Sequence, residues 1–195
     1  MPTKKQLANL KREAAALVRE GFPTRQEIVS LLRGWGESYG HPDAATVRTA
    51  VADAILAHHR RQATWTHPTD CDKLDAAFDA LTRGGVIALQ DFTDCSADGH
   101  DMLREEMKTS SPSEAIGYAF YHEQATESAI ECGELYIQFD ARENHRGKRR
   151  RIGQMVFDAL TAAGLEAGWN GDPDQAVQVT VNWQKRRKDR LPKTK

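Results

Sequence analysis

The clearest strand pattern in the chain is VQVTVNW, residues 177–183. Its apolar positions are Val177, Val179, Val181 and Trp183, and its polar positions are Gln178, Thr180 and Asn182. Side chains of a strand point alternately to two faces, so this alternation predicts a strand with one buried and one solvated face. A strand of this kind belongs to a sheet that is covered on one side.

Upstream of this stretch, short apolar runs alternate with segments of helical periodicity. The predicted strands span 86–92, 116–121, 135–139 and 165–169, and the predicted helices span 70–83, 102–107, 127–132 and 152–163. Asp70 or Asp72 suits the cap of the first of these helices, and Gly164 suits the end of the last. With residues 177–183 they predict a mixed sheet of about five strands with flanking helices.

The first 65 residues have the spacing of three helices. Leu7, Leu10, Ala14 and Leu17 recur along one helix face, and Gly21 is placed to end that helix. A second helix begins with Thr24-Arg25-Gln26-Glu27, a capping box, and a third begins near Pro42-Asp43.

The fold class predicted is therefore α+β, or mixed α/β, with a three-helix segment packed on the sheet. The expected division is a helical N-terminal segment (1–66), a sheet domain (67–184) and a basic C-terminal tail (185–195). We expect the tail to have little to bury.

Composition is typical of a soluble globular protein, with 39% hydrophobic and 28% charged residues among 195. Apolar runs stay far below the roughly 18 residues that a membrane span needs, so no membrane association is expected. The three cysteines are too few and too scattered for a disulfide framework, which favours a cytoplasmic location.

Charge is unevenly distributed along the chain. Residues 1–65 carry a net charge of +4, residues 66–145 a net −12 and residues 146–195 a net +7. Either these stretches neutralise one another within the fold, or they form faces for oppositely charged partners.

Metal binding is considered because two spaced pairs of His and Cys occur. The pairs are His67 with Cys71 and Cys95 with His100, which zinc could use tetrahedrally. Their spacing matches no established zinc pattern, so we predict neither a bound metal nor another cofactor.

Candidate catalytic groups gather at the end of the predicted strand 116–121. Tyr121, His122 and Glu123 are adjacent there, although adjacency along the chain does not place side chains on one face. An acyl-CoA-binding turn of the N-acetyltransferase type is also considered at Gly147, but Gly153 is too distant to share that turn.

Two basic runs, residues 146–151 and 185–190, suit contact with an anionic partner. Arg149, Arg150 and Arg151 are the predicted binding residues, and Asp140 and Glu143 are their expected partners within the chain. Because no aromatic residues interleave the runs, sequence-specific nucleic-acid binding is not expected.

Most of the chain resembles a bacterial family known only as a domain of unknown function. The residues that carry the resemblance are 69–78 (TDCDKLDAAF), 91–95 (DFTDC), 117–124 (GYAFYHEQ), 159–165 and 169–171 (WNG). Members of that family carry a C-C-x-x-C-G cluster where this chain has Asp94-Cys95-Ser96-Ala97-Asp98-Gly99. The resemblance implies a bacterial cytoplasmic protein and supplies no activity.

These observations lead to two hypotheses about function. The first is a non-enzymatic protein of the accessory or immunity type that binds another macromolecule, most simply a protein or a second copy of itself. The alternative is a small transferase or acyl-CoA-binding enzyme with a site near Tyr121, His122 and Gly147.

Overall fold

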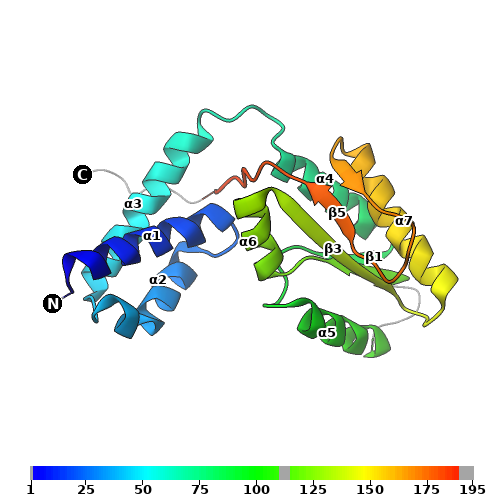
Figure 1. Cartoon of the computed structure of the whole chain (residues 1–195), viewed down its shortest axis with the longest axis horizontal. Helices are drawn as coiled ribbons and strands as arrows, with labels where there is room; N and C mark the ends of the chain where they lie inside the picture. Colours follow the sequence, from blue (N-terminus) through cyan, green and yellow to red (C-terminus); the bar gives the residue numbers. More distant parts are fainter. Residues whose placement is uncertain (1, 110–114, 189–195) are drawn as a thin grey trace. The chain divides into compact units, whose positions relative to one another are not determined.

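The structure is a computed structural model that describes residues 2–109 and 115–188. Contacts divide the chain into two compact units (Figure 1). One unit comprises the chain up to His67 together with the chain from Gln184 onward, and the other comprises Pro68–Trp183. The second unit is therefore inserted between two segments of the first.

Among its described residues, the helical unit contains three α-helices and a short 3₁₀ helix. They are α1 (Lys4–Glu20), α2 (Arg25–Gly34), η1 (Gly36–Tyr39) and α3 (Ala44–Gln62). Thr24 caps α2 in the predicted capping box. The Thr24 hydroxyl accepts from the Glu27 N–H, and the Glu27 carboxylate accepts from the Thr24 N–H. The buried core of the helical unit includes Leu10, Val18, Ile28, Leu32, Val47 and Val51.

Residues 184–188 pack against these helices instead of lying free. Arg187 is only 5% exposed, and its Nη2 donates to the Pro23 carbonyl at 2.7 Å. Its backbone N–H donates to Oε1 of Gln62 at 2.9 Å. The expectation that this part of the tail has little to bury is thus wrong, because a long arginine side chain can satisfy buried carbonyls. The rest of the predicted tail lies outside the described residues.

The second unit is built on a mixed five-stranded sheet, so the α+β class is confirmed. Its strands are β1 (Val86–Leu89), β2 (Gly117–Phe120), β3 (Glu134–Ala141), β4 (Glu166–Gly168) and β5 (Val177–Thr180). The strand order is β1-β2-β3-β5-β4, with β1 and β2 parallel and every other pair antiparallel.

Four helices accompany this sheet. They are α4 (Asp70–Arg83), α5 (Ser96–Thr109), α6 (Glu123–Cys132) and α7 (Arg146–Ala162). Figure 1 shows α4 and α7 on one side of the sheet and α5 on the other. Tyr118 and Phe120 point toward α5, whereas Gly117 faces Ile152 of α7. The layer between β2 and α5 positions the site described below.

Three helices begin earlier than their apolar spacing predicts. Helix α7 starts at Arg146 rather than Ile152, because His145 caps it through Nδ1, which accepts the Gly147 N–H. Its first turns are Arg- and Lys-rich, and these residues favour helix without leaving an apolar signal. In the same way, α5 begins at Ser96 and α6 at Glu123.

The predicted alternation at residues 177–183 is confirmed. Val177, Val179, Val181 and Trp183 are all buried, while Thr180 and Asn182 are exposed. Among the described residues, none of the helices is both long and apolar enough to cross a membrane.

Candidate functional site: a cationic pocket

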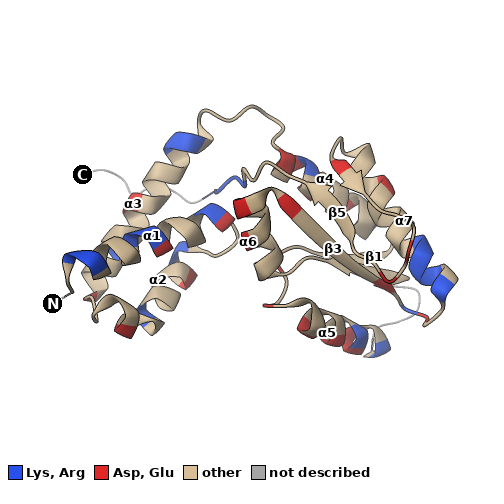
Figure 2. Cartoon of the chain, in the orientation of Figure 1, with Lys and Arg blue, Asp and Glu red and all other residues tan. Residues whose placement is uncertain are grey.

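A pocket of about 540 Å³ opens on the α5 side of the sheet. Its lining residues are Arg104, Met107, Lys108, Tyr118, Asp140, Ala141, Arg142, Asn144 and Arg149. Four of them are cationic and one, Asp140, is anionic, so we call it the cationic pocket. Figure 2 shows Lys and Arg residues gathered at the start of α7, the helix that contributes Arg149 to the lining.

Strand register brings the walls of the pocket together. Tyr118 on β2 pairs with Asp140 on β3, so both side chains project from the same face of the sheet. Helix α5 lies over that face and contributes Arg104, while the chain after β3 turns back into α7 and contributes Arg149.

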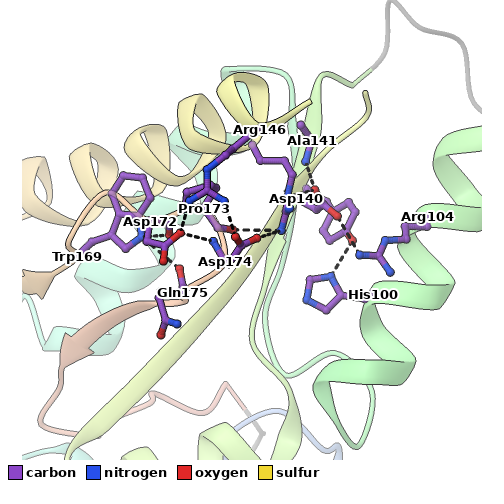
Figure 3. Close-up of polar contacts among 12 residues, drawn as sticks. His100, Arg104, Asp140, Ala141, Arg146, Trp169, Asp172, Pro173, Asp174 and Gln175 are labelled. Atoms are coloured by element: carbon purple, nitrogen blue, oxygen red, sulfur yellow. Dashed lines mark hydrogen bonds and ion pairs between the residues drawn. The ribbon is translucent and has the colours of Figure 1, made fainter. Parts of the chain in front are cut away.

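Asp140 lies between two of the arginines (Figure 3). Its Oδ2 accepts from Nη2 of Arg104 at 3.0 Å, and its Oδ1 is 3.1 Å from Nε of Arg149. Oδ1 also accepts the backbone N–H of Ala141 at 2.8 Å. The carboxylate is 8% exposed, and its hydrogen bond raises the pKa of the Arg104 guanidinium.

A second acidic group anchors Arg149 on the side away from α5. Nη2 of Arg149 is 3.0 Å from Oδ1 of Asp174 and donates to the Pro173 carbonyl. Arg146 joins the same turn through ion pairs to Asp172 and Asp174. Residues 169–175 therefore hold the first turn of α7 in place, as Figure 3 shows.

Arg142 lines the pocket and is fixed by hydrogen bonds to two backbone carbonyls. Its Nε donates to the Ala115 carbonyl at 2.8 Å, and its Nη1 donates to the Met107 carbonyl at 2.6 Å. It thus links the end of β3 to α5 while adding positive charge. Lys108 is exposed and pairs with Glu105 one helical turn earlier.

Tyr118 lines the pocket, and His100 is bonded to it from outside the lining. Nδ1 of His100 lies 2.7 Å from the Tyr118 hydroxyl, and the Gln138 side chain bonds to the same imidazole. Burial, with the positive charge of Arg104, lowers the pKa of His100, and burial raises the pKa of Tyr118. One hydrogen bond therefore joins Nδ1 of His100 to the Tyr118 hydroxyl, and the tautomer of the imidazole sets which of the two groups donates.

The predicted catalytic group of Tyr121, His122 and Glu123 has other surroundings. Tyr121 is fully buried, and its hydroxyl donates to Oε1 of Gln90 at 2.7 Å. Nδ1 of His122 caps α6 by accepting the Ala125 N–H, and burial lowers the pKa of this histidine. The Tyr121 hydroxyl and the His122 imidazole are thus both engaged in hydrogen bonds within the fold.

Glu123 lies in the first turn of α6, among other acids. Burial raises its pKa, and the nearby charges of Asp91 and Asp94 raise it further. Gly147, the other part of the acyl-CoA hypothesis, is exposed in the first turn of α7. Gly147 follows the end of β3, where Ala141 pairs with Gly117 at the start of β2. Tyr121 follows the other end of β2, so the structure does not bring Gly147 and Tyr121 together.

The four candidate metal ligands are not assembled into a site. Cys71 is buried in the core of the sheet unit, and His100 is bonded to Tyr118 on the other side of the sheet. His67 belongs to the helical unit. Across residues 2–109 and 115–188, no three His, Cys, Asp or Glu side chains are close enough to hold an ion.

The three predicted binding arginines diverge around α7. Arg149 enters the cationic pocket, Arg151 lines a smaller cavity of about 190 Å³, and Arg150 is exposed near Gly171. Asp140 pairs with Arg149 as expected, but Glu143 pairs with Lys148 instead.

Sequence reasoning missed Arg104, Lys108 and Arg142 as parts of the site. No local motif marks them, because they reach the pocket from α5 and from the residue after β3. Their only signal was basic residues within the strongly acidic stretch 66–145, where just five Lys and Arg occur.

Comparisons with known proteins identify a family. No curated protein and no solved structure matches the chain in these comparisons. The family described as "Domain of unknown function (DUF6891)" matches residues 3–187, nearly the whole chain and both units. The resemblance found in the sequence is therefore confirmed, and the chain belongs to the DUF6891 family.

Proposed function

We propose that this protein acts by binding and not by catalysis, and that its cationic pocket receives an anionic group of a partner protein. The observation that carries this proposal is the charge of the lining, four cationic side chains against the single carboxylate of Asp140. An accessory or immunity-type protein would use such complementarity for specificity and fast association.

Two features favour a protein over a nucleic acid as the partner. The aromatic residue in the lining, Tyr118, is fully buried and offers no face on which a base could stack. The basic side chains also surround one pocket, whereas a nucleic-acid backbone requires a track of repeated phosphate contacts.

Two features support binding over catalysis. The buried hydroxyl of Tyr121 and the imidazole of His122 are already engaged by Gln90 and by the start of α6. Gly147 lies away from both, so these residues offer no common position for a substrate. The three cysteines form no disulfide with one another, which suits a reducing compartment such as the bacterial cytoplasm.

A fluorescein-labelled hexaglutamate peptide tests the binding role by fluorescence anisotropy. We expect the wild type to bind it, Arg149→Gln to weaken binding at least tenfold and added salt to weaken it further. Arg83→Gln is the matched control, since Arg83 is exposed at the end of α4 and its loss changes the net charge equally.

Three outcomes would overturn the proposal. Equal weakening by Arg83→Gln and Arg149→Gln would show non-specific attraction. Tighter binding of a single-stranded 12-nucleotide DNA than of the peptide would replace the protein partner with a nucleic acid. Turnover of an acyl-CoA by the purified chain would replace binding with catalysis.

A further inference from the structure

Asp140 occupies the position between Arg104 and Arg149 where an incoming anion would gain most. The carboxylate is held there by Arg104 and by the Ala141 N–H, and it projects from a strand instead of a loop. The pocket therefore contains one fixed negative charge before any ligand arrives.

The cations around the pocket already have acidic neighbours. Asp174 pairs with Arg149, Glu105 pairs with Lys108, and Asp101 lies 3.9 Å from Arg104. A single ligand carboxylate would meet arginines that are already paired with carboxylates, so it should gain much less than a ligand with several charges, such as hexaglutamate.

Spare donors remain for a ligand with more charge and more oxygens. Each guanidinium has five N–H donors, and the contacts of Arg104 and Arg149 use only some of them. Nε of Arg149 is buried 3.1 Å from Oδ1 of Asp140, so the donors of this guanidinium that remain for a ligand lie on its two terminal nitrogens. A phosphate monoester supplies a charge of about −1.5 to −2 and three acceptor oxygens.

Resting on the proposed function, we infer that the cationic pocket selects the dianion of a phosphate monoester over a carboxylate, and that the anion binds beside Asp140. The fixed charge of Asp140 repels every anion in proportion to the charge of that anion, but the net charge of the lining is positive, so a dianion is attracted more strongly than a monoanion. Arginine forks also match phosphate oxygens in bidentate geometry.

The phosphate could come from two sources with the same chemistry. One is a phosphorylated side chain of a partner protein, and the other is a free small phosphate ester. A pocket of about 540 Å³ is large enough for either, since small-molecule sites span about 300–1,000 Å³. The experiment below includes an arm for each source.

The test compares three peptides with neutral flanking residues and a central phosphoserine, glutamate or serine, and it adds free O-phosphoserine. We expect the wild type to bind the phosphoserine peptide at least tenfold more tightly than the glutamate peptide. Arg149→Gln should lose this binding, while Arg83→Gln should retain it. In Asp140→Asn both the phosphoserine and the glutamate peptide should gain affinity, because the repulsion by the carboxylate is lost.

A pH series gives a readout that needs no substitution. The second pKa of a phosphate monoester is about 6, so affinity for the phosphoserine peptide should fall between pH 7.5 and 5.5. The glutamate peptide stays ionised over that range and serves as the control for titration within the pocket. Thermal melting of each variant confirms that it is folded.

The possible results separate the inference from the proposed function. Equal affinity for phosphoserine and glutamate peptides, with hexaglutamate still bound through Arg149, would overturn the phosphate preference alone. An Asp140→Asn variant that gains affinity for neither peptide would show that the anion binds away from Asp140 and would overturn the inference. If O-phosphoserine binds as tightly as the phosphopeptide, the phosphate preference stands and the protein partner of the proposed function falls.

Discussion

Gly99 lies so close to the ring of Phe120 that a Cβ atom at position 99 would come within 2.3 Å of Cε2. This close approach seats the first turn of α5 on β2. Arg104 lies further along the same helix, so the contact fixes its height above Asp140. A glycine outside the pocket lining thus sets the height of Arg104 above Asp140.

Replacing Gly99 with Ala should lower the free energy of unfolding by about 1–3 kcal/mol, because the buried ring of Phe120 has to move. This cost exceeds the gain of up to about 1 kcal/mol that alanine brings to a helix interior. Urea denaturation measures it. Gly168→Ala is the control, since nothing lies within 4 Å of its added Cβ. Equal stability of the two variants would contradict the packing argument.

His58 should make stability depend on pH. It is buried, its Nε2 lies 3.1 Å from the Lys185 carbonyl, and burial lowers its pKa to about 4. A carbonyl only accepts, so Nε2 carries the proton of a neutral ring. The unfolded chain binds a proton below about pH 6.5 and the folded chain only below about pH 4, so stability is lost as pH falls through that window.

The expected loss between pH 6.5 and 4 is about 3 kcal/mol, from about 1.4 kcal/mol per pKa unit. Denaturation at several pH values should show this slope reduced in His58→Gln and retained in His41→Asn, a change at an exposed histidine of the same unit. An unaltered slope in His58→Gln would assign the pH dependence to other groups.

Val179 tests the sheet core. It is fully buried on β5, between Leu135 of β3 and Ala167 of β4. Val179→Ala should lower the free energy of unfolding by about 1–3 kcal/mol, through lost burial and a residual cavity. Thr180→Ala changes the exposed neighbour and should cost much less. A melting temperature equal to that of the wild type would contradict the burial of this face.

The three adjacent arginines should differ in their effect on stability. Arg149→Gln removes the ion pairs to Asp140 and Asp174, which should cost about 0.5–1.5 kcal/mol because the guanidinium is partly exposed. The double change Arg150→Gln with Arg151→Gln should stay within about 0.5 kcal/mol of the wild type, since both side chains are exposed. Thermal melts compare them, and a larger effect of the double change would reverse this assignment.

Purified protein should contain no stoichiometric zinc. The structure gives His100 a hydrogen bond to Tyr118 and buries Cys71 in the core, so neither is free to serve as a ligand with the other. Elemental analysis measures the metal content. One zinc per chain that disappears in both Cys71→Ser and Cys95→Ser would establish the site that we do not expect.

Local signals in the sequence predicted most of the elements of the fold. The alternation around Val179 and the capping box at Thr24 depend on neighbouring residues, and both occur in the structure. Helix starts were harder to predict. Those of α6 and α7 are capped by His122 and His145, and the first turns of α7 are Arg- and Lys-rich and carry no apolar spacing.

The cationic pocket could be predicted only in part. Arg149 and its partner Asp140 were expected from the charge pattern, since a helix that begins with arginines needs nearby anions. Arg104 comes from α5, and its approach to Asp140 depends on the β2–β3 register and on the contact at Gly99. Long-range packing of this kind leaves no mark at short spacing along the chain.

The insertion of the sheet unit has a consequence for synthesis on the ribosome. Asp70 and Asn182 lie at the two ends of that unit, and Oδ2 of Asp70 accepts the Asn182 N–H at 3.0 Å. All residues of the sheet unit have been made before Arg187, which the helical unit needs to satisfy the Pro23 carbonyl. Helices α1 to α3 can therefore form their contacts with Arg187 only after the whole sheet unit has been synthesised.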